Sequence, residues 1–98
     1  MANICVDTFY AESQNRENLD TILKFFDKHF PTYALGDDSE ETIELYFESK
    51  WSFPESLMND LYNLIPDKSD IYMRCLSVEY GCMYHALWYC DEDGWHEC

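Results

Sequence analysis

The sequence predicts one α+β domain with the element order β-α-β-α-β-β, in which two helices cover one face of a four-stranded, mainly antiparallel sheet. Two observations lead to this fold class. Apolar and polar residues alternate near the start, in the middle and twice near the end, as in half-buried strands, and two stretches between them repeat apolar residues at helical spacing. The 98 residues, 47% of them hydrophobic, suit a single core, so we expect one domain over residues 1–98.

The first half of the chain predicts a strand, a helix and a second strand. β-branched and aromatic residues alternate over residues 2–10, which is typical of a strand. A helix follows and ends before Pro31; its apolar face is Leu19, Ile22, Leu23, Phe26 and Phe30. An acidic turn from Gly36 then leads into a half-buried strand, where Ile43, Leu45 and Phe47 alternate with Glu44, Tyr46 and Glu48.

The second half predicts a second helix. Ser52 and Glu55 match a capping box, in which a hydroxyl and a carboxylate bond to backbone donors at a helix start, and Pro54 is compatible with the first turn. The helix ends at Pro66, and its apolar stripe is Leu57, Met58, Leu61, Leu64 and Ile65.

A hairpin follows this helix. Residues 71–80 and 82–90 are both rich in β-forming residues, and a tight turn at Tyr80 and Gly81 separates them. After another turn at Asp93 and Gly94, residues 95–98 either add a short strand or extend freely from the edge.

The charge balance is strongly acidic. Twenty Asp and Glu against six Lys and Arg give a formal net charge of -14. This excess argues against direct binding to nucleic acid or to an anionic membrane, and it favours a basic protein surface or a cation as partner. The alternative is that the acidity only keeps an aromatic-rich protein in solution. The sequence has no long apolar run and no signal-peptide pattern at its start, so we expect a cytoplasmic protein.

The Cys, His and acidic residues near the end of the chain were considered as metal ligands. A zinc set would be Cys82, His85, Cys90, His96 and Cys98, but it lacks finger spacing, and strand alternation separates His85 from the first two cysteines. A calcium set would be Asp91, Glu92, Asp93 and Glu97, but it lacks the loop register. Usual enzyme signatures are absent, so we expect no catalysis, cofactor or metal. The five cysteines favour reduced thiols, mostly in the core, with Cys98 exposed.

Aromatic residues are concentrated on the final hairpin: Tyr72, Tyr80, Tyr84, Trp88, Tyr89 and Trp95. Aromatic rings on a sheet can stack on RNA bases. However, Arg74 is the only Lys or Arg from residue 69 to residue 98, so the charge argues against RNA. We expect these rings to form the core on one face and a protein-contact patch on the other.

Several spaced residues resemble a known family. The pattern comprises an aromatic strand that ends in Trp51, a helix opened by Pro54, a Glu-Tyr pair before Gly81 and an Asp-Gly turn, carried here by Glu79, Tyr80, Asp93 and Gly94. It resembles the YubB-type ferredoxin-like domain of plasmid and phage proteins, and Asn3 and Cys5 also fit, although Ile4 replaces a Trp. The resemblance covers the opening strand and the last half of the chain. The resemblance implies a ferredoxin-like two-layer sandwich without an iron–sulfur cluster. It also implies that the protein is encoded on a mobile element and acts in the host cytoplasm.

The candidate binding site is an acidic run in the middle of the chain. It consists of Asp37, Asp38, Glu40, Glu41, Glu44, Tyr46 and Glu48, with no intervening base. On the outward strand face, every second residue is about 6.7 Å further along. Carboxylates spaced in this way can imitate the phosphates of a nucleic acid, and a surface that grips phosphates with Lys and Arg would attract them.

From these features we expect a small non-catalytic interaction protein. It would inhibit or modulate a nucleic-acid-binding host defence protein, such as a CRISPR effector or a restriction system, by imitating nucleic acid. Two alternatives remain open. One is a metal- or thiol-dependent enzyme that uses the C-terminal Cys and His residues, and the other is a structural or assembly protein that forms a homodimer through its sheet.

Overall fold

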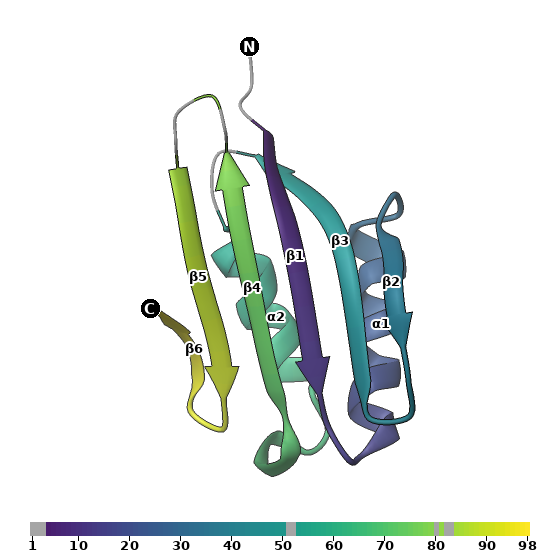
Figure 1. Cartoon of the computed structure of the whole chain (residues 1–98). Coiled ribbons are helices and arrows are strands. Elements are labelled where there is room, and N and C mark those ends of the chain that lie inside the picture. The colour runs from purple at the N-terminus through teal and green to yellow at the C-terminus, as the bar shows by residue number, and fades with distance from the viewer. Residues whose placement is uncertain (1–3, 51–52, 80, 82–83) are drawn as a thin grey trace.

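A computed structural model describes residues 4–50, 53–79, 81 and 84–98. Within these ranges the chain forms six strands, two α-helices and one short 3₁₀ helix (Figure 1). Their bounds are β1 (Ile4–Glu12), α1 (Arg16–His29), β2 (Ala34–Asp38), β3 (Thr42–Lys50), α2 (Glu55–Leu64), η1 (Lys68–Asp70), β4 (Tyr72–Glu79), β5 (Tyr84–Asp91) and β6 (Gly94–Glu97). Neither described α-helix is long and apolar enough to cross a lipid bilayer.

All six strands belong to one antiparallel sheet in the order β2-β3-β1-β4-β5-β6. The expected α+β class is confirmed, but the four-stranded ferredoxin-like sandwich is wrong, because β2 and β6 add an edge strand on each side. Every residue of β2 is exposed, and the strand contains Gly36 and two Asp, so no apolar alternation marks it in the sequence. β6 has only four residues, too few to display a period.

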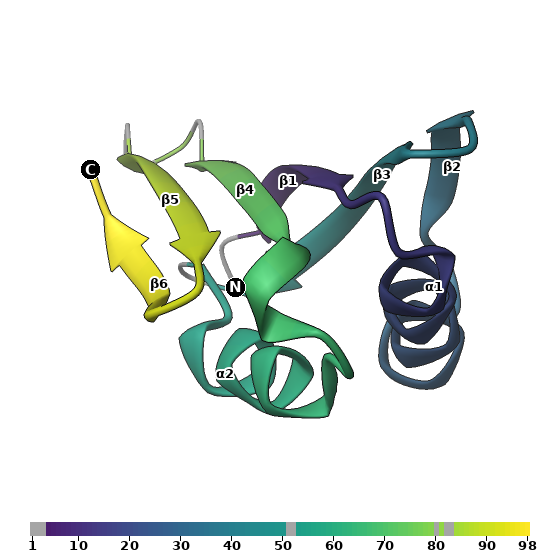
Figure 2. The same ribbon diagram turned by 90° about the horizontal axis from the view of Figure 1, so that it is seen from below.

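The chain path explains why both helices lie on one face of the sheet. Helix α1 connects β1 to β2, with β3 between them, and α2 connects β3 to β4, with β1 between them. Each helix therefore crosses between parallel strands, and the two crossovers run in opposite directions across the sheet. Crossovers of the usual right-handed kind then place both helices on the same side. Figure 2 shows α1 and α2 below the sheet, whose other face has no helix over it.

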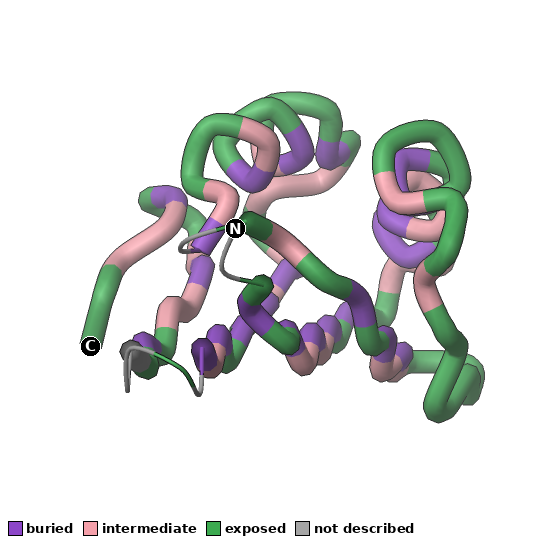
Figure 3. Tube along the Cα trace, turned by 90° about the horizontal axis from the view of Figure 1, so that it is seen from above, coloured by how far each residue is buried: buried purple, intermediate pink, exposed green. Residues whose placement is uncertain are grey.

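The core lies between this helical layer and the sheet. On β1 the buried residues are Cys5, Asp7, Phe9 and Ala11, and they alternate with more exposed neighbours (Figure 3). The expected inward residues of β3, Ile43, Leu45 and Phe47, are all buried. Helix α1 contributes Leu19, Ile22, Phe25 and Phe26, and α2 contributes Met58 and Leu61. The apolar periods in the sequence therefore identify the core-facing sides, except that Leu64, expected in the apolar stripe of α2, is exposed.

The start of α2 differs from the capping-box prediction. The helix begins at Glu55, with Pro54 in the N-cap position and no side-chain capping hydrogen bond. Ser52, the expected cap, lies outside the described residues. The expected antiparallel pairing of the last two long strands is confirmed, because β4 and β5 pair from Met73 opposite Cys90 to Glu79 opposite Tyr84. The turn expected at Tyr80 and Gly81 falls largely outside the described residues.

A buried amide joins α1 to the connection between α2 and β4. The Asn18 side chain donates to the backbone carbonyl oxygens of Asp67 and Asp70, both at 2.9 Å, and accepts from the Asp67 backbone N–H at 3.0 Å. Asn18 is fully buried, so these bonds replace the water that the amide loses on folding. The contact holds η1 against the first turn of α1.

Candidate protein-binding face

The acidic run predicted as the binding site occupies β2, β3 and the turn between them. Asp37, Glu40, Glu41 and Glu48 are exposed, and Glu44 is half-buried. Glu44, Tyr46 and Glu48 alternate with the buried residues of β3 and so lie on the sheet face opposite the helices, as the alternation predicts. Asp38 differs, because the Arg16 guanidinium at the start of α1 lies 3.2 Å from its carboxylate. That ion pair fastens the β2–β3 hairpin to α1.

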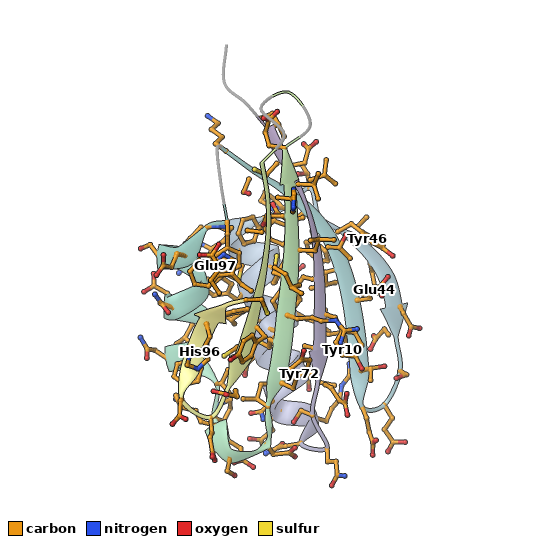
Figure 4. All side chains as sticks on the ribbon, turned by 60° about the vertical axis from the view of Figure 1, so that its left-hand side comes forward. Tyr10, Glu44, Tyr46, Tyr72, His96 and Glu97 are labelled. Atoms are coloured by element: carbon orange, nitrogen blue, oxygen red, sulfur yellow. The ribbon has the colours of Figure 1, made fainter. Side chains whose placement is uncertain are left out.

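Tyr46 is fixed in place on this face. Its hydroxyl donates to the Glu44 carboxylate, and a Cβ added at Gly36 on the neighbouring strand would overlap its ring. The ring therefore covers the glycine at the β2 bulge between Leu35 and Asp37. The hydrogen bond to Glu44, more than burial, raises the pKa of Tyr46 above its ordinary value. Figure 4 shows Glu44 and Tyr46 one above the other on β3.

Apart from Asp38, the carboxylates of these strands lie close to one another, and no described basic side chain forms an ion pair with them. In the β2–β3 register Asp37 is directly opposite Glu44, an arrangement of like charges that destabilises a sheet. Glu12 of β1, which sequence reasoning missed, is opposite Thr42 and adds another exposed carboxylate. Within the described part of the chain, Glu12, Asp37, Glu44 and Glu48 form no ion pair. We call these four residues the acidic edge.

A polar groove of about 480 Å³ lies at the end of the acidic edge. Three carboxylates line it, from Glu12, Glu41 and Asp70, and the Asp70 carboxylate accepts from the Gln14 backbone N–H at 3.1 Å. The remaining lining residues are Ser13, Gln14, Ser69, Ile71 and Tyr72. The acidic surface therefore continues around the end of the sheet, with room for a cationic side chain.

Beside the acidic edge, the open sheet face carries apolar residues that sequence reasoning also missed. Ile4, Val6, Leu76 and Leu87 are 40–45% exposed, and the half-buried Val78 completes the group. Register brings them together: Val6 lies opposite Val78, and Leu76 lies opposite Leu87. We call these five residues the apolar strip. The available signal was that residues 4–9 place apolar side chains on both faces of one strand.

The next row of the open face is aromatic. The Arg74 guanidinium lies 4.2 Å from the ring centre of Tyr10 and 5.9 Å from that of Tyr72, so it makes cation–π contacts with both rings. Tyr89 and His96 extend this row, with ring centres 5.1 Å apart. Trp88 and Trp95 point the other way into the core, where Trp95 donates to the Met58 carbonyl at 2.8 Å. Tyr80 lies outside the described residues.

The two possible metal-ligand sets are not brought together within the described ranges. Cys90 faces the core, whereas His85 and His96 lie on the open face, and Cys82 is outside the described residues. Asp91 accepts from the Asp93 backbone N–H at 2.9 Å and pairs with His96 at 3.2 Å, while Glu97 lies on the opposite sheet face. No group of three His, Cys, Asp or Glu suited to a metal occurs among the residues that the structure describes.

The three buried thiols among the described residues are poorly suited to nucleophilic chemistry. Cys5, Cys75 and Cys90 are buried, and burial is the main cause that raises the pKa of each, that of Cys90 to about 12. A raised pKa keeps the thiol protonated, and only the thiolate is a strong nucleophile. Cys98 is exposed, as expected.

One carboxyl group lies inside the molecule. Asp7 on β1 is fully buried and accepts from the hydroxyls of Ser77 and Ser49, the latter at 2.6 Å. Burial raises its pKa to about 6, although both hydrogen bonds oppose the shift. The side chain shares a face with Cys5 and Phe9, so the strand alternation already assigns it to the inner side.

Comparisons with known proteins add no further assignment: no family model, no curated protein and no solved structure matches the chain. The resemblance to the YubB-type domain therefore stays a prediction from the sequence. The candidate face is defined by its own geometry, namely an acidic edge on β1, β2 and β3 beside an apolar strip on β1, β4 and β5.

Proposed function

We propose that this domain is a non-catalytic protein-binding module whose acidic edge occupies the nucleic-acid-binding surface of a basic partner. The observation that supports it most is the direct opposition of Asp37 and Glu44 on an exposed edge without a counter-charge. Such a pair costs stability in the free domain. Lys and Arg from a partner would relieve that repulsion, so binding would recover the free energy that the repulsion costs the free domain.

The positions of the six basic residues agree with this proposal. Arg16 is held by Asp20 and Asp38, and Arg74 rests on aromatic rings. Lys68 donates to the Ile65 and Asn63 carbonyls, and Lys24 and Lys28 belong to α1 on the other side of the sheet. Two basic residues share the open sheet face with Glu48, namely Arg74 and, at the end of β3, Lys50. The acidic edge therefore keeps a long-range negative potential that steers a basic partner toward it.

The resemblance to domains of plasmid and phage proteins suggests the class of partner. A nucleic-acid-binding protein of a host defence system, such as a CRISPR effector or a restriction enzyme, holds nucleic acid with Lys and Arg. A mobile element would benefit from a protein that blocks such a surface in the host cytoplasm.

Charge reversal tests the proposal. Glu44→Lys with Glu48→Lys should slow association with a partner captured from host lysate and flatten the salt dependence, while thermal stability should not fall, because the change at Glu44 removes the like charge opposite Asp37. Asp60→Lys with Glu92→Lys is the matched control, because it changes the net charge equally on exposed residues of α2 and the β5–β6 turn. Duplex DNA or RNA should displace the protein from its partner. A partner that holds the protein and its nucleic acid together, with affinity indifferent to the reversals, would contradict the proposal.

A further inference from the structure

Resting on the proposed function, we infer that the apolar strip is the docking site for a basic amphipathic helix of the partner, with its Lys or Arg residues above the acidic edge. The strip comprises Ile4, Val6, Leu76, Val78 and Leu87, and no described helix covers it. It adds specificity to a contact that charge alone would leave indiscriminate, because apolar packing requires a matching shape.

The dimensions of the strip fit one helix. It extends over β1, β4 and β5, which is two strand spacings or about 10 Å. From Ile4 to the level of Thr8, which lies opposite Leu76, it runs about 13 Å along the strands. A helix with its side chains is about 10–12 Å wide and rises about 5.4 Å per turn, so between two and three turns would cover the strip. The other face of the same sheet already packs two helices.

Charge identifies the side chains at the edge of that helix. Glu48 lies directly opposite Val6, so its carboxylate borders the strip at one strand spacing. Lys50 lies opposite Ile4 at the end of the strip, and Glu44 lies opposite Tyr10, one row beyond Thr8. Tyr46, opposite Thr8 in the adjoining row and 40% exposed, joins the two surfaces. A helix on the strip therefore presents one flank to Glu48 and, where it extends past the level of Thr8, to Glu44. Lys or Arg is favoured beside these two carboxylates and disfavoured beside Lys50.

A second copy of the chain is a poorer occupant. Face-to-face pairing would join two chains that each carry a formal charge of -14, with an acidic column beside each strip. The repulsion weakens at high salt, where the apolar strips alone would decide the outcome. Sedimentation at high salt therefore distinguishes a second copy from a partner helix. If the protein forms a dimer under these conditions, and Val6→Thr with Leu76→Thr abolishes that dimer, the choice of a partner helix is overturned.

Two synthetic peptides test the inference directly. LKKLLKLLKKLLKL forms a basic amphipathic helix, and QKKQQKQQKKQQKQ has the same charge without an apolar face. At physiological ionic strength the Leu peptide should bind the wild-type protein at least about tenfold more tightly than the Gln peptide, by fluorescence anisotropy. Backbone amide shifts in NMR spectra should map the Leu peptide to β1, β4 and β5.

The variants separate this inference from the proposed function. Val6→Thr with Leu76→Thr keeps strand-forming residues and should remove the preference for the Leu peptide, whereas Leu64→Gln, which alters a 58% exposed leucine on α2, should not. Equal affinity for both peptides, or shifts confined to α1 and α2, would overturn the inference and leave the acidic edge standing. If the Gln peptide binds the wild-type protein and the Glu44→Lys, Glu48→Lys variant equally, the proposed function fails instead.

Discussion

Replacing the buried carboxyl group by an amide should make the stability of the protein less dependent on pH. In the folded state the pKa of Asp7 is raised to about 6, mainly by burial, while its ordinary value is 3.8. The folded protein therefore holds this proton more tightly than the unfolded chain does. The stabilising effect of the protonated form is complete below about pH 4 and is lost as the pH rises through about 6.

The size of the effect follows from the two pKa values. Each tenfold change in proton affinity corresponds to about 1.4 kcal/mol, so the shift from 3.8 to about 6 amounts to about 3 kcal/mol at neutral pH. An Asn at this position is neutral throughout and keeps two hydrogen bonds, because its oxygen accepts from one serine hydroxyl and its NH₂ group donates to the other. Asp7→Asn should therefore gain up to about 3 kcal/mol over the wild type between pH 4 and pH 7.

Urea unfolding followed by tryptophan fluorescence at several pH values measures this difference. Other carboxyl groups titrate in both proteins, so their contributions cancel when the two free energies of unfolding are subtracted. Asp60→Asn, at an exposed position on α2, is the control for the loss of one carboxylate outside the core. A difference for Asp7→Asn that stays constant or shrinks from pH 4 to pH 7 would refute the reasoning.

Further predictions concern a buried amide, a thiol and a glycine. Asn18→Ala should lower the free energy of unfolding by about 3 kcal/mol, because it removes the side-chain partner of the Asp67 backbone N–H and carbonyl and leaves the Asp70 carbonyl only its bond from the Ser13 hydroxyl; the exposed Asn59→Ala is the comparison, and similar losses for both would disprove the role of the amide. Under native conditions a thiol reagent should modify Cys98 before the buried Cys5, Cys75 and Cys90, and equal rates, read by mass spectrometry, would be incompatible with the described core. Gly36→Ala should displace the Tyr46 ring from Glu44 and so lower the pKa of Tyr46, followed by NMR titration; an unaltered titration would mean that the ring does not depend on the glycine.

The parts of the fold that could be predicted from the sequence are those with a repeated apolar period. Leu19, Ile22 and Phe26 recur at helical spacing and are buried, and the alternation over residues 43–48 identifies both faces of β3. Strand β2 could not be predicted in the same way, because it packs no side chain into the core. It belongs to the sheet through backbone pairing with β3, which depends on the chain reversal between Asp38 and Thr42.

The candidate site was predictable only in part for a related reason. The acidic run is visible as composition, but the separation of Asp38 from the rest depends on Arg16, twenty-two positions earlier in the sequence. The apolar strip depends on register between β1, β4 and β5, since Val6 and Leu76 become neighbours only when these strands pair. Local periodicity contains no information on such pairings.

The two edge strands bear on how the protein behaves when it is concentrated. A free sheet edge is a template for strands of other copies, and the open face nearby exposes aliphatic side chains, so the domain has two features that promote fibril formation. At the β2 edge, Asp37 and Asp38 oppose the pairing of a second copy. The carboxylates of that copy would lie one strand spacing away, at about 4.8 Å. At the other edge, strand β6 has only four residues and ends at Glu97. The negative charge that would attract a basic partner under the proposed function thus also keeps copies of the chain apart in concentrated solution.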